Sequence, residues 1–430
     1  MNDSLRRNGE GLSGPVTEAI DLMLTARALL RKLMHTPGAF PLVVVICYFL
    51  AVLPILVRHG FDTSVFIVAG DRFVDPARLP SPIIVKADSD GFDGQFYYRM
   101  ALSPFQLKRA NGIQIDDPPY RTQRILYPLL AWGVAFGQAA FVPASLFLVN
   151  LFGIGAIAFL AVRLTARLCL PTLTPLAMVL WPGLIISLTH DTTEIVAAAL
   201  LLAALDAYFS ERLFAYAALG ALAALTREIS GLFLAGVACF EGVRAVSLLS
   251  WTDGWRRTII VGLALIPFVI WREALLDYWG QSPLAAAVKS DVTWPFLGIV
   301  EKLRGTLLGT GHYGNNLALR GFELGSLGLL AAFCALVSVR LSAILRASSF
   351  GVLAAGWLPV MLLMTMLLAD GPLIGPQSYF RAFTECFVVG CLIIALRPPA
   401  RWVSQVMFAG CAVGWLGACA LSFYTLFRLA

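Results

Sequence analysis

The sequence predicts an all-α polytopic membrane protein with about 11–13 transmembrane helices and a long first outer loop. Hydrophobic residues make up 59% of the 430-residue chain and charged residues only 13%, against roughly 45–50% and about 25% in soluble domains. The apolar residues also form long runs, and most charged residues lie between them. No single soluble core could bury this excess, so the bilayer must solvate most of the chain.

Eleven apolar runs define the expected spans, and some of them are shorter than the roughly 20 residues of a straight crossing. A weaker run at 125–137 is either a short span or a helix at the membrane interface. The runs cover residues 40–57, 141–162, 170–188, 193–209, 213–226, 229–243, 257–271, 321–339, 349–368, 383–396 and 403–425.

Arginine pairs in the short loops set the orientation, since positive residues favour the cytoplasmic side. If 125–137 does not fully cross, all four pairs face the cytoplasm, the chain crosses 11 times and its C-terminus lies outside. The pairs are Arg163 with Arg167, Arg256 with Arg257, Arg340 with Arg346, and Arg397 with Arg401.

The expected organisation has four parts in the inner (cytoplasmic) membrane. Residues 1–39 form a cytoplasmic, amphipathic N-terminus, within which 16–35 is apolar at helical spacing and suits the membrane surface. Residues 40–271 form a transmembrane module that includes the first outer loop, 58–124. Residues 272–320 form a second outer loop, and 321–430 hold the C-terminal helices. The net charge of +6 is modest and scattered, so no nucleic-acid partner is expected.

The first outer loop carries three acids within six residues, Asp88, Asp90 and Asp93, beside Gly91 and Gly94. The glycines let the backbone turn, so the carboxylates could point at a common site. Such a carboxylate can act as a general base toward an acceptor hydroxyl. Asp88 and Asp90 could instead hold a divalent cation through oxygen ligands. A solvated acidic turn is the alternative.

Four arginines are candidate phosphate ligands, because a planar guanidinium suits paired hydrogen bonds to phosphate. Arg121 and Arg124 precede the apolar segment ILYPLL, where they could also extend to lipid headgroups. Arg227 lies in ALTREISGLF beside Glu228, with which it could form a self-neutralising pair. Arg381 lies in ADGPLIGPQSYFRAF, a polar hairpin that also contains Asp370 and Tyr379.

Further polar residues at the same predicted face are candidate substrate contacts. Asp191 and Glu194 lie in HDTTE, between two apolar runs with almost no loop, where capping of the next helix is the alternative. Asp206 is a lone acid in an apolar run, and we expect it to contact a neighbouring helix outside the site. The complete set of substrate-contact candidates is Gln95, Tyr97, Tyr98, Arg99, Asp191, Glu194, Glu228 and Tyr379.

These features together resemble the GT-C superfamily, membrane glycosyltransferases that use polyprenyl-phosphate-linked sugars. GFDGQFYYRMALSPF followed by YRTQRILYPLLAW is most similar to bacterial members connected with cell-surface glycopolymer formation. It is also similar to the dolichyl-phosphate-mannose-dependent mannosyltransferases, and ALTRE (Ala224–Glu228) is a further typical element. The large soluble C-terminal domain of oligosaccharyltransferases is not present in this sequence.

The resemblance implies a GT-C-like bundle, a polyprenyl-phosphate-linked sugar donor and a glycan or lipid acceptor on the periplasmic or extracellular side. It implies that an acid of the first outer loop is the base, here Asp93, with Asp88 and Asp90 next. Arginines near the outer face would bind the lipid phosphate, here Arg124, Arg227 and Arg381. No nucleotide cofactor is expected, because no glycine-rich phosphate cradle follows a strand.

Two other functions fit the same residues. A flippase or transporter of lipid-linked saccharides would also need charges within the membrane. We find no obvious duplication of the kind seen in many transporters, and the polar residues gather on one side, which favours an enzyme. A ligase that uses a polyprenyl-pyrophosphate donor shares the chemistry of the transferase.

Overall fold

A computed structural model describes residues 25, 32–33, 36, 38–247, 253–286, 292–311, 313–346, 350–367 and 373–427. Within these ranges nearly every regular element is a helix, and the two strands have two residues each. An all-α fold with several membrane-crossing helices is therefore confirmed. The expected surface helix at 16–35 falls almost wholly outside the described residues, and so does Asp370.

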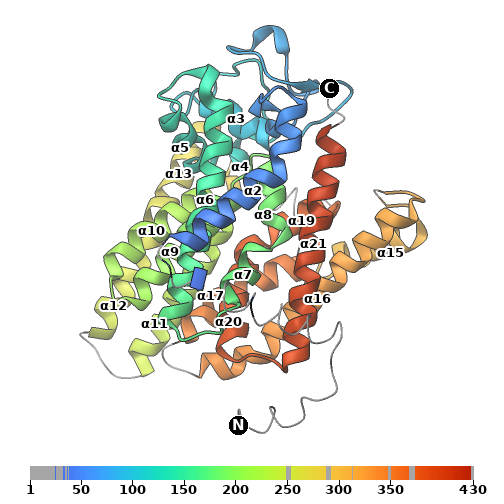
Figure 1. Cartoon of the computed structure of the whole chain (residues 1–430). Coiled ribbons are helices and arrows are strands. Elements are labelled where there is room, and N and C mark those ends of the chain that lie inside the picture. Colours follow the sequence, from blue (N-terminus) through green and yellow to red (C-terminus); the bar gives the residue numbers. More distant parts are fainter. Residues whose placement is uncertain are drawn as a thin grey trace, which may run out of the picture.

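Six described helices are long and apolar enough to cross a membrane. Their long axes run through the bundle in Figure 1. A seventh span results if the helices Pro376–Ala382 (α19) and Thr384–Leu396 (α20), bent by 57°, count as one. The six are Ala39–Arg58 (α2), Ala139–Arg167 (η3 and α6), Glu228–Ser247 (α11), Gly254–Trp279 (α12, η4 and α13), Leu317–Leu345 (α16) and Arg401–Phe427 (α21).

The other expected runs are also helical, but their helices are shorter than 18 residues. The run 170–188 is divided into α7 and α8 because Pro182 begins a new helix and cannot continue the previous one. The run 125–137 forms a helix of nine residues, about 14 Å long, which is too short to cross. The short helices are Leu126–Val134 (α5), Thr174–Val179 (α7), Pro182–Thr189 (α8), Glu194–Phe209 (α9), Leu213–Thr226 (α10) and Gly351–Leu362 (α17), the last continued by the π-helical turn Leu363–Leu367.

The second outer loop differs from the expectation. The helix expected to end at residue 271 continues to Trp279, because its sequence contains no glycine or proline between Pro267 and Gly280. Within the remaining segment, Leu297–Leu308 (α15) forms a helix that extends away from the bundle in Figure 1.

The first outer loop has an apolar core of its own, which packs on α5 and α6. Ile67, Phe96, Tyr97 and Tyr127 are central to this core. The loop lies at the end of the bundle opposite the start of α21 (Figure 1). Its elements are Thr63–Ile67 (η1), Ala69–Gly70 (β1), Pro76–Arg78 (η2), Val85–Lys86 (β2), Gly94–Leu102 (α3) and Pro118–Thr122 (α4), with β1 and β2 parallel.

Large apolar side chains also remain on the outside of the bundle. Leu50, Phe152, Phe214, Trp402 and Leu416 are each more than half exposed. Apolar surface of this extent is unusual for a soluble monomer and is what lipid would cover. The eight cysteines are free, and four of them are buried.

Candidate functional site

A cluster of charged side chains lies where several helices end beneath the first outer loop. Asp93 immediately precedes α3, and Arg121 lies in α4. Glu194 begins α9, Arg227 lies between α10 and α11, and Arg381 lies in α19. Segments that are far apart in the sequence therefore supply the charges, and each charge is at or near a break in a helix.

Asp93 is held between two guanidinium groups. One carboxylate oxygen lies 2.9 Å from Nη1 of Arg121 and the other lies 2.8 Å from Nη2 of Arg381. The Asp93 side chain is 17% exposed and does not cap α3. Gly94 allows this approach, because a Cβ there would lie 2.5 Å from the carbonyl oxygen of His190. The structure thus joins the first outer loop to the α8–α9 junction at Asp93.

The two arginines also set the acidity of Asp93. Burial alone would raise the pKa of this carboxyl, but Arg121, Arg381 and Arg124 hold the pKa well below its usual range. Burial would lower the pKa of Arg121, and Asp93 together with Asp116 raises it. These groups are therefore ionised together and stabilise one another.

A second part of the cluster joins Arg381 to Arg227 through Glu194. The Oε1 atom of Glu194 lies 3.5 Å from Nε of Arg381 and 3.8 Å from Nε of Arg227. Arg227 also contacts Glu385, with Nη1 2.5 Å from Oε2, and donates to the carbonyl oxygen of Ala382. Thr193, which precedes α9, makes no side-chain capping hydrogen bond, and Glu194 also accepts from the hydroxyl of Ser187 at 3.3 Å.

Several donors in this part of the cluster lack a hydrogen bond. Nε and Nη1 of Arg381 and Nε of Arg227 are buried and make no hydrogen bond within the described residues. The two Nε atoms face Oε1 of Glu194 only at the longer ion-pair distances of 3.5 and 3.8 Å. A buried donor without an acceptor is costly. Guanidinium donors in this state can accommodate an anion such as a phosphate group.

Arg124 and Glu228 form a separate, fully engaged pair. Nε of Arg124 lies 2.9 Å from Oε2 of Glu228, and Nη2 lies 2.5 Å from Oε1. Arg124 also donates to the hydroxyl groups of Tyr97, at 3.0 Å, and Tyr120. Of the two alternatives for Arg227, the self-neutralising pair with its neighbour Glu228 is not formed, and Arg227 and Glu228 each pair with a residue of another segment. Arg124 fixes the loop on α11 and has few donors left for a ligand.

Aromatic rings support the guanidinium groups of the cluster. Arg381 lies over the ring of Phe92 at 4.8 Å, and Arg121 lies over the ring of Phe96 at 5.0 Å. Phe92 in turn contacts the ring of His190, with centroids 4.5 Å apart. Cation–π contacts of this kind stabilise the positions of the cations.

Asp88 and Asp90 lie outside the cluster, on the solvent side of the loop. Asp90 is 68% exposed and pairs with Arg72 at 3.1 Å. The backbone N–H of Asp88 donates to Asp71 at 2.9 Å. The left-handed turn at Gly91 separates this segment from Asp93, so the three carboxylates do not converge. Of the three acids, the structure brings only Asp93 to the arginines.

The remaining candidates are buried in other contacts. The Gln95 side chain accepts from the N–H of Gly70 and donates to the carbonyl of Asp90, so it braces the loop. Arg99 donates to the carbonyl of Leu107, and Tyr379 donates to the carbonyl of Glu323. The hydroxyl of Tyr98 lacks a hydrogen bond within the described residues.

Asp191 is fully buried beside the cluster. It adopts a positive φ of 45°, and neither carboxylate oxygen has a hydrogen-bond partner within the described residues. Such a group is unusual in a folded protein. Its position in HDTTE, three residues before Glu194, makes it a further acid of this region.

Two members of the cluster were not predicted. Glu385 binds Arg227 and is 2% exposed. Glu385 follows Arg381 by four residues at the start of an apolar run. Residues at this spacing lie on one face of a helix, so the sequence could have indicated that Glu385 lies near the predicted site. Asp116 binds Arg121 at 2.7 Å and comes five residues before it in DDPPYR.

Within the described residues, no group of three or more His, Cys, Asp or Glu side chains has the arrangement of a metal site. The cation predicted at Asp88 and Asp90 stays a prediction. The chain matches no protein-family model, no curated protein and no solved structure. The functional argument therefore depends on the geometry of the cluster.

Proposed function

We propose that this protein transfers a sugar from a polyprenyl-phosphate-linked donor to a cell-envelope glycan or lipid acceptor. The reaction would take place at the non-cytoplasmic face of the inner membrane, in a GT-C-like bundle of 11–13 crossings. The observation that carries the proposal is the pair of contacts from Asp93 to Arg121 and Arg381. It combines a potential proton acceptor with cations that suit a phosphate.

In the proposed reaction, an acceptor hydroxyl oxygen attacks the anomeric carbon of the donor sugar and forms the new glycosidic bond. Asp93 takes the hydroxyl proton. The bond from the anomeric carbon to the phosphate oxygen breaks, and polyprenyl phosphate leaves with the bonding electron pair. Arg381 and Arg227 stabilise the negative charge of the leaving group through their unused N–H donors.

The contacts of Asp93 also suggest how the base would become active. While Arg121 and Arg381 both bind Asp93, its low pKa makes it a poor proton acceptor. A donor phosphate that binds Arg381 would draw this guanidinium away from the carboxylate. Asp93 would then become more basic only when the donor is in place.

The distribution of charge supports an enzyme over a flippase. The cluster lies at one end of the bundle, and Asp206 and Glu241 pair with arginines near the other end. A transport path would require polar groups between these ends, near the middle of the membrane. A ligase that uses a pyrophosphate donor is compatible with the same cluster, so the donor has to be varied in the test.

The direct test is sugar transfer by the full-length protein in proteoliposomes. Radiolabelled polyprenyl-monophosphate sugars and a polyprenyl-pyrophosphate glycan would be supplied with envelope acceptors. The wild type is compared with Asp93→Asn, and Asp90→Asn is the matched control, because Asp90 is exposed in the same loop. We expect transfer from a monophosphate donor by the wild type and by the control, and none by Asp93→Asn.

Other results would change the assignment. Transfer that survives in a folded Asp93→Asn protein moves the base to Asp191, the buried acid beside the cluster. Transfer from the pyrophosphate donor alone identifies a ligase. Movement of the lipid-linked saccharide across the bilayer without transfer identifies a flippase.

A further inference from the structure

A cavity of about 430 Å³ lies in the half of the bundle remote from the charged cluster. The C-terminal end of α21 lies beside the end of α2, where His59 contacts the carbonyl of Leu426 at 3.1 Å. The cavity begins at the other end of α21, at Arg401. A helix of 27 residues is about 40 Å long, so this cavity is distinct from the cluster.

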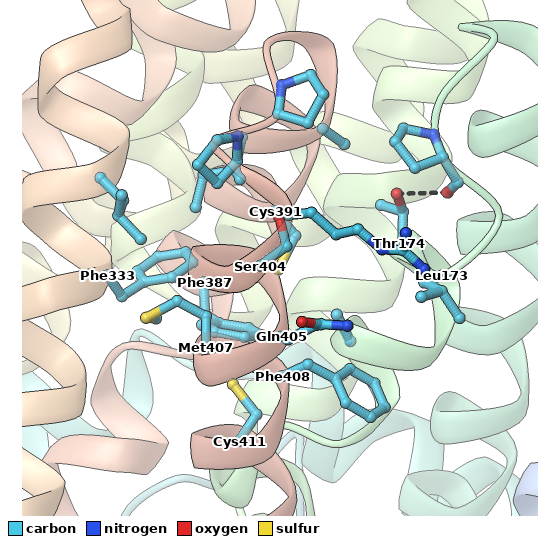
Figure 2. A pocket seen from close by; sticks show the side chains of 18 residues that line it. Leu173, Thr174, Phe333, Phe387, Cys391, Ser404, Gln405, Met407, Phe408 and Cys411 are labelled. Carbon is cyan, nitrogen blue, oxygen red and sulfur yellow. Dashed lines mark hydrogen bonds between the residues drawn. The ribbon is translucent and has the colours of Figure 1, made fainter. Parts of the chain in front are cut away.

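Apolar side chains from four segments form the walls of the cavity. Leu173 immediately precedes α7 and Thr174 begins it, while α16 contributes Phe333, α20 contributes Phe387 and α21 contributes Cys411 (Figure 2). The lining on α21 extends from Arg401 to Cys411, about 15 Å along the helix. This volume is within the range of ligand sites, and the shape suits a hydrocarbon chain.

The rim of the cavity is positively charged and contains no acid. Arg401 lines the cavity. Arg340 donates to the backbone carbonyl of Arg397 at 2.6 Å and to that of Leu336, a residue of the lining, so a second guanidinium lies at the same end of the cavity. The sequence contains no Asp or Glu after Glu385, and none between Glu323 and Asp370. Among the described residues, Arg340, Arg397 and Arg401 form no ion pair with a carboxylate.

The start of α21 adds to this charge. The first turn of a helix presents free N–H groups and the positive end of the helix dipole, which together favour an anion. Ser404 and Gln405, which follow Arg401 by three and four residues, are polar side chains of the lining (Figure 2). Trp402 and Val406 on the same helix are more than half exposed, as expected of residues that face lipid.

We propose that this cavity binds an anionic phospholipid of the cytoplasmic leaflet, with one acyl chain inside and the phosphate at Arg340 and Arg401. The arginine pairs orient this end of the bundle to the cytoplasm. That leaflet is rich in anionic lipids, and basic pockets between transmembrane helices bind their headgroups. The inference goes beyond the proposed transfer reaction and does not rest on it.

Native mass spectrometry of the full-length protein tests the proposal, with phosphatidylglycerol and phosphatidylcholine of the same acyl chains as probes. From the two arginines we expect phosphatidylglycerol to bind about 30-fold more tightly. The double variant Arg340→Gln/Arg401→Gln should reduce its affinity to that of phosphatidylcholine. Ala395→Trp, which fills the cavity, should weaken both lipids. Arg346→Gln, at the same end but outside the lining, is the matched control and should change neither.

Equal binding of the two lipids by the wild type would overturn the proposal, and so would an equal loss in Arg346→Gln. If the double arginine variant does not fold, Ala395→Trp decides, because unchanged lipid binding by this variant excludes the cavity. Polyprenyl phosphate is added in the same measurement as a lipid that competes with phosphatidylglycerol for the cavity. Displacement of phosphatidylglycerol by an equimolar amount of it would overturn the phospholipid as the occupant.

Discussion

We call the end of the bundle beneath residues 58–124 the outer end, after its predicted orientation, and the opposite end the inner end. Both ends carry contacts between acids and arginines. The contacts differ in how deeply the side chains are buried and in whether their polar atoms all form hydrogen bonds. At the outer end, Arg227 is 5% exposed and Glu194 is 1% exposed, and the closest contact between them is 3.8 Å. At the inner end, Asp206 lies 2.8 Å from Arg163 and 3.1 Å from Arg167, and these arginines are 42% and 31% exposed.

This difference distinguishes structural ion pairs at the inner end, which hold helices together, from a candidate functional site at the outer end. Glu241 at the inner end is buried, but it accepts from Tyr208 and lies 3.3 Å from Arg257, so its oxygen is engaged. The outer end leaves buried N–H donors of Arg227 and Arg381 without acceptors. Protein interiors rarely retain such donors, and their presence is therefore a better indicator of function than the number of charges.

The largest effect should come from Asp93. We expect Asp93→Asn to lower the rate of sugar transfer about 10³-fold, because removal of a general base commonly costs this much. The amide keeps the shape of the side chain, and thermal unfolding monitored by intrinsic fluorescence reports whether the variant is folded. A decrease of less than tenfold in the folded variant would remove Asp93 from the reaction.

The next effect should come from the arginines with unused donors. We expect Arg381→Gln to lower kcat for transfer about 10²-fold, the usual effect of losing one group that stabilises a developing anion. Arg163→Gln at the inner end is the control and should change kcat less than about twofold, as is usual for exposed ion pairs. Equal decreases in kcat for Arg381→Gln and Arg163→Gln would contradict the proposal that only the outer end takes part in transfer.

A smaller effect concerns the pH dependence of the outer end. Because the arginines hold the pKa of Asp93 below its usual range, the free protein should keep this carboxylate ionised down to about pH 4. The stabilisation that Asp93 gives is then present above the ordinary pKa of an aspartate. It is lost as the pH falls through the lowered value.

We therefore expect no acid limb in kcat/KM above about pH 4, since this parameter reports the free enzyme. Arg381→Gln removes one of the two cations that contact Asp93, so the pKa of Asp93 should rise. The acid limb of kcat/KM should then move up by about one pH unit. A pH profile of transfer on the outer side of sealed vesicles measures this. An acid limb near pH 6 in the wild type would contradict the assignment.

Much of the fold could be predicted from the sequence, because apolar runs report directly where a chain must avoid water. Each of the eleven predicted runs is helical over most of its described residues. The length of each helix was less predictable. Pro182 divides one run, and the helix that contains Trp271 continues through Arg272 and Glu273, two charges that suggested its end.

The site was predicted less completely than the fold. Arg121, Arg227 and Arg381 could be recognised as charged groups at the ends of apolar runs, and Asp93 as one of three acids beside glycines in the first outer loop. Their pairing depends on contacts between distant segments, which a sequence pattern does not specify. This is why Arg227 binds Glu385 and Glu194, and Glu228 binds Arg124 instead of its neighbour.

The smallest effect should come from Asp206, which the sequence predicts as a contact between helices and the structure joins to Arg163 and Arg167. Because these arginines are partly exposed, we expect Asp206→Asn to lower the free energy of unfolding by roughly 0–1 kcal/mol. Transfer activity should stay within about twofold of the wild type, as for other exposed ion pairs. Denaturant unfolding at low and high salt measures the stability, and the difference between variant and wild type should shrink as salt screens the contact. A large loss of transfer in a stable Asp206→Asn protein would mean that the inner end takes part in the reaction, and the contrast between the two ends would fail.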